Sequence, residues 1–429
     1  MTQPDRLTAI TRESSANAVI SWGLVVVLCI PLIGSLWTGR YEPVVFSLAA
    51  LIIILAPAIT RRDPTVFAPW YLIGVICLPV IWEALAPQPF VTRFIPSLAT
   101  AALGLLIAVE LHRFTRLHLI PWFAVLLTVL FTMAMGGLYH MLRWTADVFV
   151  GTSFLLDGRS QDAINAAVMI ELIYTTLAGI LAGGLFYLYF KHNGRENGKS
   201  EQVKSRPRAK RENVEGIPLS RRIGIPLAYQ RRIVTGMQIV LIGLFGYGAV
   251  SRDIAIATNA LIAIGVTLIP PILERDYRIP IEPGLVLWIT TAVFLHTLGT
   301  AGLYDAIAPW DHLTHTFSAT VVAAAGYATL RAIHLHEEHI YLPRWALFAL
   351  TLVFVLTMGV VWEILEFFAD QGALYMGLDP VLAQHGIDDT IVDMMFNLLG
   401  AIIVATWGTI YLTEVSESLA DRLETWTSG

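Results

Sequence analysis

The feature that most constrains this chain is a series of apolar stretches, each about 17–25 residues long. A stretch of this length crosses the hydrocarbon of a bilayer as a helix, in which every backbone polar group is bonded internally. Only 14% of the residues are Asp, Glu, Lys or Arg, against about a quarter in soluble domains. The sequence therefore predicts an all-α integral membrane protein and excludes a soluble enzyme. We expect twelve transmembrane helices, at residues 18–36, 43–60, 69–86, 94–111, 119–142, 166–190, 234–250, 254–273, 284–303, 313–333, 343–368 and 390–412.

The loops between these spans differ in their Lys and Arg content, which predicts the orientation of the chain. If both termini are cytoplasmic, 23 of the 28 basic residues lie on the cytoplasmic side. The outer segments then contain only Arg40, Arg93, Arg143, Arg159 and Arg252. We therefore expect a multi-pass protein of a prokaryotic plasma membrane, with both termini and the central linker in the cytoplasm.

The segment 191–232 carries twelve of the basic residues and separates two groups of six spans. One interpretation is a patch that binds anionic lipid or nucleic acid. We prefer a solvated linker that enforces the topology, because four Glu residues dilute its charge and no aromatic residues are interleaved with the basic residues of 199–222 to stack on bases. We expect the lipid bilayer as a partner and no nucleic acid.

The two groups of spans repeat each other in sequence. Residues 304–309 resemble 82–87 at an offset of 222, and 358–366 resemble 135–143 at an offset of 223. An even number of spans in each half predicts parallel repeats related by an axis along the membrane normal. We expect a degenerate six-span repeat at 1–190, the linker at 191–232, and a six-span repeat with a polar site at 233–429. Such a chain is a fused dimer, which leaves its own oligomeric state open.

Polar residues gather at the outer ends of three consecutive spans in the second half. Apart from His312, which points about 60° further round, the members of each set recur at helical spacing and share one helix face. From residue 305 to 397, the outer face carries nine carboxylates and no Lys or Arg. Such residues inside a membrane usually face a bundle interior or a water-filled cavity. The three sets are Asp311, His312 and His315; Glu363, Glu366 and Asp370; and Asp389, Asp393 and Asn397.

Several neighbouring carboxylates in a low-dielectric site take up protons or a cation, because they cannot all stay ionised. Carboxylates and imidazoles on facing helices are typical ligands of magnesium, manganese, iron or zinc. We predict Asp311, His315, Glu363, Asp389 and Asp393 as ligands of a divalent metal ion. Glu366 is the candidate catalytic general base. His312, Asp370 and Asn397 are candidates for substrate contacts or for support of the ligands. The alternatives are helix capping by Asp388 and Asp389, interfacial hydration of Asp370, and a hydrogen bond from His312 to a loop.

The first half has lost this pattern. Glu363 and Glu366 fall opposite His140 and Arg143, and Glu171 lies near the position that corresponds to the acidic stripe of the last span. Arg93 and Arg143, together with Arg159, form a candidate anion or substrate site. The alternative is that these arginines make salt bridges to Asp147, Asp157 and Asp162.

Three motifs carry a resemblance to a known family. They are residues 310–315, which open the tenth span with Asp311 and His315, then 363–366, and then 386–401 with Asp393 and Asn397. In these motifs the chain resembles the YjdF-like family of prokaryotic membrane proteins over about 285–412, and more distantly the VanZ-like proteins. The resemblance implies a six-span unit with candidate site positions, and it implies no reaction.

Three classes of function follow from the polar site. The first is a metal-assisted enzyme acting on a lipid-linked or phosphorylated substrate at the outer leaflet, where the metal would activate water or polarise a phosphoryl oxygen. The second is a cation- or proton-coupled transporter. The third is an accessory membrane protein in which the polar cluster fixes helix packing. The acidic residues lie at one membrane side rather than at the midplane, which favours an interfacial site over a transport path.

Overall fold

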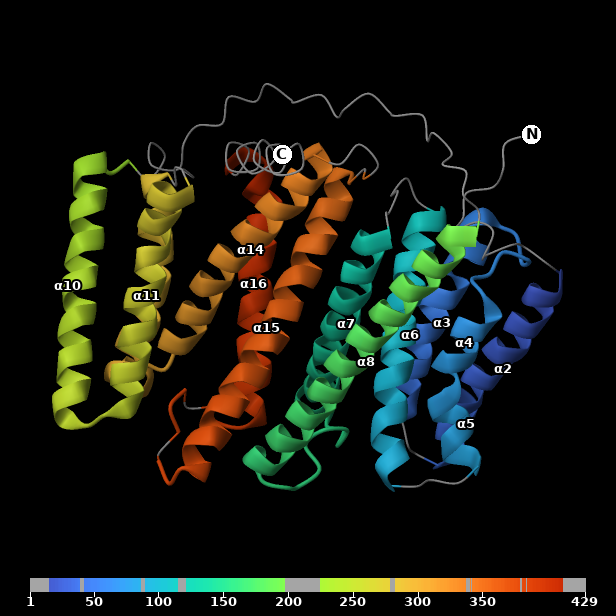
Figure 1. Ribbon diagram of the computed structural model, residues 1–429. Coiled ribbons are helices and arrows are strands. Elements are labelled where there is room, and N and C mark those ends of the chain that lie inside the picture. The colour runs from blue at the N-terminus through green and yellow to red at the C-terminus, as the bar shows by residue number, and fades with distance from the viewer. Residues whose placement is uncertain are drawn as a thin grey trace. The chain divides into compact units, whose positions relative to one another are not determined.

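The computed structural model describes residues 15–38, 42–85, 89–114, 121–196, 224–277, 282–336, 340, 342–378, 380–382 and 384–411. Every regular element in these residues is a helix (Figure 1). Ten of the helices are long and apolar enough to cross a membrane, and they coincide with ten of the twelve predicted spans. The chain forms two compact units. Unit 1 comprises Met1–Ser205 and His339–Pro343, and unit 2 comprises Arg206–Glu338 and Arg344–Gly429.

Unit 1 contains six apolar segments in up-and-down order. Its described helices are α2 (Ser15–Thr38), α3 (Glu42–Arg61), α4 (Trp70–Ile76), α5 (Leu78–Leu85), α6 (Pro89–Phe114), α7 (Pro121–Val150) and α8 (Gln161–Glu196). The last three pack on one another in all pairs, and α2 packs on α3, α4 and α5. The predicted linker at 191–232 is helical at both of its described ends, because α8 and the first helix of unit 2 extend beyond the apolar runs.

The predicted span at 69–86 consists of two short helices rather than one. The segment is divided at Cys77 into α4 and α5, which have seven and eight residues. Pro79 explains the division, because proline has no N–H to donate to Val75 and its ring clashes with that carbonyl. The Cys77 thiol instead donates to the Leu24 carbonyl of α2 at 3.5 Å.

Unit 2 follows the same order with one irregular connection. Its described elements are α10 (Leu227–Ser251), α11 (Ile254–Tyr277), α12 (Pro283–Leu298), the π-helix η1 (Gly299–Leu303), α13 (Tyr304–Ala306), α14 (Trp310–His336), α15 (Arg344–Tyr375) and α16 (Ile387–Tyr411). The ninth predicted span, at 284–303, therefore leaves the α-helical path at Gly299. Gly302 has a φ of 121°, a conformation that glycine adopts without steric penalty.

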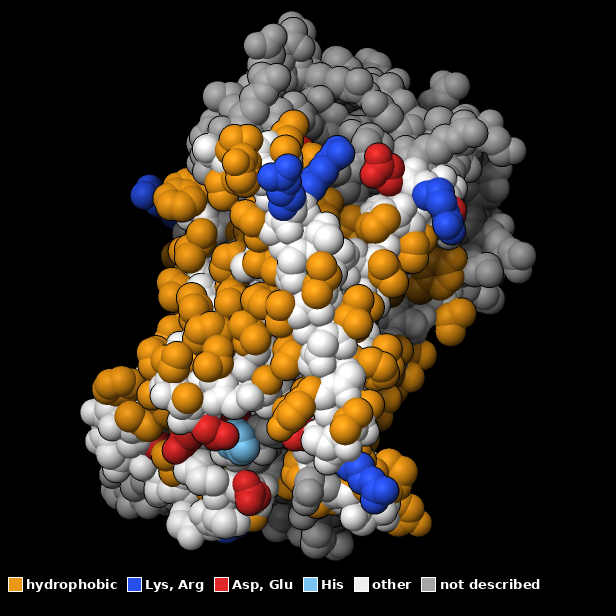
Figure 2. Space-filling view, turned by 90° about the vertical axis from the view of Figure 1, so that its left-hand side faces the viewer, with side chains coloured by type: hydrophobic (Ala, Val, Ile, Leu, Met, Phe, Trp, Pro, Cys, Tyr) orange, Lys and Arg blue, Asp and Glu red, His pale blue; other side chains and the backbone are white. Residues whose placement is uncertain are grey.

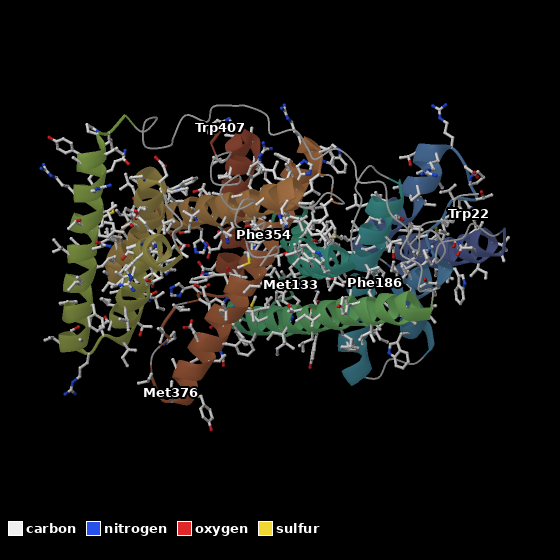
Figure 3. The ribbon with its side chains drawn as sticks, turned by 45° about the horizontal axis from the view of Figure 1, so that its top comes forward. Trp22, Met133, Phe186, Phe354, Met376 and Trp407 are labelled. Carbon is white, nitrogen blue, oxygen red and sulfur yellow. The ribbon has the colours of Figure 1, made fainter. Side chains whose placement is uncertain are left out.

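Helices α14, α15 and α16 pack on one another in all pairs. The close approach of α16 to α14 depends on Gly400, because a Cβ at this position would lie 2.5 Å from the Thr316 carbonyl oxygen of α14. Met376, just after α15, and Trp407, near the end of α16, lie at opposite ends of this group in Figure 3. The first turns of α14 and α16 and the last turns of α15 therefore meet at one end, which we call the loop end of unit 2.

The outward faces of unit 2 are apolar. Helix α10 exposes apolar side chains from Leu227 to Val250, with Ile239 and Tyr247 among them. Figure 2 shows a broad hydrophobic band, with most of the visible Lys and Arg side chains at one end and acidic side chains with a histidine at the other. Apolar exposure on this scale is expected of a surface that contacts lipid. The tenth predicted span, at 313–333, is helix α14, which is long enough to cross a membrane but is less apolar because it contains four His and four Thr.

Candidate metal centre

The first turn of α14 brings two of the predicted ligands together. Asp311 and His315 are four residues apart, so both side chains project from the same helix face. The His315 Nε2 atom lies 3.6 Å from Asp311 Oδ1. His315 is buried, so its imidazole faces the interior of unit 2 rather than lipid.

The first turns of α16 complete this arrangement from the opposite side. Asp393 is buried, and its Oδ2 atom lies 3.5 Å from His315 Nε2. His315 therefore stands between two carboxylates from different helices. Asn397 continues the same face one turn further on, and its side chain is also buried.

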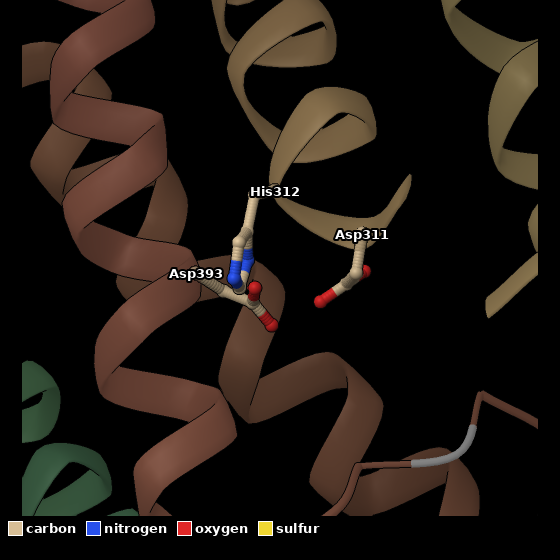
Figure 4. Close-up of side chains that lie close together, drawn as sticks. All are labelled: Asp311, His312 and Asp393. Carbon is tan, nitrogen blue, oxygen red and sulfur yellow. The ribbon is translucent and has the colours of Figure 1, made fainter. Parts of the chain in front are cut away.

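A group of possible metal-ligand atoms around the same two carboxylates contains a different histidine. Asp311, His312 and Asp393 each offer one ligand atom, and these atoms lie within 4.8 Å of one another. Figure 4 shows the His312 ring beside the Asp393 carboxylate, with the Asp311 carboxylate pointing toward both. The ring of His312 also stacks on Phe396 at a centroid distance of 4.3 Å, with an angle of 8° between planes. This stacking turns His312 toward α16, which the helical wheel of α14 alone does not predict.

Helix α15 supplies the most deeply buried acid. Glu363 is fully buried, and its Oε2 atom accepts a hydrogen bond of 2.9 Å from Gln384 Nε2. Glu366, one turn closer to the loop, is also buried. Gln384 was not among the residues singled out in the sequence, because it lies in a loop with no helical period to mark it.

Two of the predicted residues have local structural roles. Asp370 accepts backbone N–H groups from Val381 and Leu382 at 2.8 Å each and from Gln384 at 3.0 Å. It thereby fixes the loop after α15 and places the Gln384 amide against Glu363. Asp389 Oδ2 accepts the His385 N–H at 3.0 Å; because α16 begins at Ile387, Asp389 lies in the first helical turn rather than at the N-cap.

The buried acids lack basic partners. Among the described residues, no Lys or Arg lies within ion-pair distance of Asp311, Glu363, Glu366 or Asp393. In the same residues, His315 lies within that distance of Asp311 and Asp393. Glu363 Oε1 and Asp393 Oδ1 are buried without a hydrogen-bond partner in the described part of the chain, as is His312 Nδ1. Buried polar atoms in folded proteins are nearly always bonded, to protein groups or to ordered water, so these three atoms leave bonding capacity that water or a ligand can fill.

A hydrogen-bonded chain adjoins the acidic group. The Tyr304 hydroxyl lies 2.6 Å from His296 Nδ1 and 3.4 Å from Thr314 Oγ1. The ring of Tyr304 occupies the space beside Gly299, where any Cβ would collide with it. The sequence did not single out Tyr304, because only the π-helix turns it back onto His296 of α12.

The arginines of unit 1 engage acidic partners. Arg143 lies 3.9 Å from Glu171 and donates to the Phe154 carbonyl, and Arg159 lies 2.8 Å from Asp157. The hydrogen bond from Arg159 holds the pKa of the Asp157 carboxyl below its usual value. The side chain of Arg93 lies outside the described residues, so an anion site that includes it stays a prediction.

Comparison with known proteins fits the second half of the chain into a family. Residues 233–414 match the model described as "Predicted membrane protein (DUF2238)". Over 139 residues the chain is 31% identical to a Thermotoga maritima protein called "Uncharacterized protein", covering 32% of this chain and 67% of that protein. The chain belongs to the DUF2238 family.

Every residue of the candidate metal centre lies within the DUF2238 match. The resemblance to the YjdF-like family is thereby confirmed for the C-terminal region, whereas the likeness to VanZ-like proteins stays a prediction. Residues 5–67 match a different model, "Domain of unknown function (DUF8268)". No solved structure matches the chain.

Proposed function

We propose that unit 2 binds a divalent cation at its loop end and uses it as a membrane enzyme on a lipid-linked or phosphorylated substrate. The observation that carries the cation is the group Asp311, His312 and Asp393, whose ligand atoms lie within 4.8 Å of one another. Two carboxylates and an imidazole are a donor set suited to manganese, iron or zinc, and magnesium accepts the carboxylates.

The unpartnered oxygens of Glu363 and Asp393 support the same proposal. Adjacent buried carboxylates repel one another unless they take up protons or a cation replaces those protons. A cation bound by Asp311, His312 and Asp393 would compensate the charges of Glu363 and Glu366 as well. His315, 3.5 Å from Asp393 and 3.6 Å from Asp311, would orient both ligands.

The location of the group supports an enzyme over a channel. Asp311, His312, Asp389 and Asp393 all lie in the first two turns of their helices, beside the loop that Asp370 fixes. A site at helix ends is accessible to a headgroup in the interface. When bound, the cation would polarise a phosphoryl oxygen or an attacking water. Glu366 would then accept the proton, and Asp389 and Asn397 would contact the substrate.

One observation favours transport as a second candidate. Glu363 is fully buried and lies twelve residues before the end of α15, about three helical turns inside the span. In a cation- or proton-coupled transporter, this carboxylate would be loaded and released as access alternates. The accessory role remains the third candidate, in which the cluster serves packing alone.

We propose further that the chain crosses a prokaryotic plasma membrane twelve times, with both termini in the cytoplasm. The ten apolar helices supply ten of the crossings. Helix α14 and the pair α4–α5 would supply the other two. The concentration of Lys and Arg in the cytoplasmic loops supports this orientation, and it puts the loop end of unit 2 on the outer side.

The duplication is part of the same proposal, and packing inside each unit supports it. A Cβ at Gly104 of α6 would collide with Thr132 of α7, and a Cβ at Gly326 of α14 would collide with Phe354 of α15. Gly326 follows Gly104 in the sequence by 222 residues, and Phe354 follows Thr132 by the same number. The same close contact between corresponding helices thus recurs at corresponding positions.

A second pair of contacts follows the same rule. The neighbours of Gly136 on α8 are Leu172 and Thr175, and the neighbours of Gly359 on α16 are Met394 and Asn397. The glycines differ by 223, and each of the two neighbours differs from its counterpart by 222. Helices α6, α7 and α8 therefore correspond to α14, α15 and α16, which also pack on one another in all pairs.

Manganese titration of the detergent-purified protein tests the proposed function. The wild type should bind Mn²⁺, detected by the loss of the free-ion electron paramagnetic resonance signal, and Asp311→Asn and Asp393→Asn should each abolish binding. Asp253→Asn, which changes a carboxylate at the start of α11 outside the group, is the matched control and should bind as the wild type does. If the wild type binds none of Mn²⁺, Zn²⁺ or Mg²⁺, the cation proposal is wrong and the accessory role takes its place. Uptake of the bound ion into proteoliposomes would favour the transporter over the enzyme.

A further inference from the structure

The acidic residues of unit 2 have counterparts in unit 1 with different charges. Glu363 corresponds to His140 and Glu366 to Arg143 at an offset of 223, and Asp393 corresponds to Glu171 at 222. Three acids in one unit therefore stand where a histidine, an arginine and one acid stand in the other. The comparison concerns the interior of each unit by itself.

The three residues of unit 1 lie close together. The His140 Nε2 atom lies 3.6 Å from Glu171 Oε2, and Arg143 Nη1 lies 3.9 Å from the same oxygen. The guanidinium of Arg143 also donates to the carbonyl oxygen of Phe154 in the loop after α7. His140 is buried, and the side chain of Arg143 is only 12% exposed. The side chain of Glu171 is 47% exposed, so the nearly buried guanidinium of Arg143 faces a carboxylate at the edge of unit 1.

The frame around the two groups is the same. Asp147 accepts the backbone N–H groups of Phe154, Leu155 and Leu156 at 2.7, 2.6 and 2.8 Å. Its counterpart at an offset of 223 is Asp370, which accepts three N–H groups of the loop after α15. Each unit therefore uses one carboxylate to fold the loop over its own polar group. The difference between the units lies in the charges rather than in the scaffold.

From this comparison we infer that Arg143 supplies, inside unit 1, the positive charge that a bound cation supplies in unit 2, so that the chain binds one cation and binds it in unit 2. The inference rests on the proposed function. In unit 1 the side chain that compensates Glu171 is covalently part of the protein. In unit 2 all three positions are acids, so the compensating positive charge comes from a bound cation rather than from a side chain.

An anion site around Arg143 is the competing interpretation of the same residue. It would need the guanidinium to face a ligand, whereas Arg143 already contacts Glu171 and the Phe154 carbonyl. A carboxylate so close to the guanidinium repels an anion. The contacts of unit 1 therefore favour an internal ion pair.

The test measures how many Mn²⁺ ions the full chain binds and which acid the binding requires. The wild type should bind one equivalent. Glu171→Gln should leave both the stoichiometry and the affinity unchanged while lowering the apparent Tm by a few degrees, because Arg143 loses its carboxylate. The corresponding Asp393→Asn should lose binding. Two equivalents in the wild type, or loss of binding in Glu171→Gln, would overturn the inference and leave the unit 2 site standing. No binding in the wild type would instead refute the proposed function.

A reciprocal substitution tests the equivalence of arginine and cation. Glu366→Arg puts into unit 2 the residue that unit 1 has at this position. This variant should not bind Mn²⁺, and its apparent Tm in EDTA should exceed that of Glu366→Gln, which removes the same charge without adding one. A lower Tm for Glu366→Arg than for Glu366→Gln contradicts the inference. If Glu366→Arg does not insert, the stoichiometry of the wild type and of Glu171→Gln decides the question.

Discussion

Replacing Glu363 by Gln should change stability in opposite directions with and without a cation. Glu363 is fully buried, with one oxygen bonded to Gln384 Nε2 at 2.9 Å and the other without a partner in the described residues. Without a cation, this side chain must be buried as a charge near other acids or as a protonated acid. A glutamine keeps the shape, its oxygen still accepts from Gln384, and its NH₂ group can donate toward the neighbouring carboxylates.

The size of the effect follows from these contacts. An unsatisfied buried polar atom costs about 1–3 kcal/mol, so Glu363→Gln should stabilise the cation-free protein by about that amount. For a unit of this size, the gain corresponds to a rise of roughly 2–10 °C in apparent Tm. With a cation at about 100 times its Kd, the wild type should gain about 2.7 kcal/mol. Glu363→Gln should gain much less, because the charge that favours the cation is smaller. The order of stability should therefore reverse or become equal when the cation is added.

Thermal unfolding of the detergent-purified proteins, in EDTA and in excess Mn²⁺, measures both effects. Glu274→Gln is the matched control, because Glu274 lies exposed near the end of α11 and its loss should change neither Tm. The reasoning is refuted if Glu363→Gln is less stable than the wild type in EDTA, or if Mn²⁺ stabilises both proteins equally.

Three further predictions concern packing, the loop and the topology. Gly400→Ala should destabilise the protein by about 1–3 kcal/mol through overpacking, since its Cβ would lie 2.5 Å from a backbone oxygen of α14; Gly265→Ala, with open space around its Cβ, should be neutral in the same thermal assay. Asp370→Asn should accelerate limited proteolysis within 376–386. The carboxylate accepts hydrogen bonds from three backbone N–H groups of this loop, and the NH₂ group of an asparagine cannot accept the one that it would face. An unchanged cleavage rate would show that Asp370 does not hold the loop. In intact cells without other cysteines, an impermeant thiol reagent should label Ser153→Cys and spare Thr65→Cys, and the opposite pattern would invert the topology.

Local periodicity explains why much of the site could be predicted from the sequence. The spacing of Asp311 with His315, and of Asp389 with Asp393, puts each pair on one helix face whatever the helix packs against. Consecutive antiparallel helices then bring the first turns of α14 and α16 together, as the 3.5 Å distance between His315 and Asp393 shows. The need for internally bonded backbone in lipid explains why the apolar runs are helices.

Contacts between segments distant in sequence could not be predicted in this way. The ring of His312 lies near the carboxylates of Asp311 and Asp393, and it stacks on Phe396 of another helix. Gln384 reaches Glu363 only because Asp370 folds the loop between them. Tyr304 reaches His296 only because a π-helix interrupts the end of α12.

The sequence by itself therefore determined that the chain is helical and membrane-embedded, and which acids share a helix face, because both follow from the order of neighbouring residues. Only the tertiary structure decided which of those acids keep an unpartnered oxygen and which are used to fix a loop. It also decided that Arg143 meets Glu171 inside unit 1, whereas the corresponding acids of unit 2 meet no arginine in the described residues. Such partners are set by how the helices pack and how the loops return, and side chains from different helices meet there at distances that no sequence period encodes.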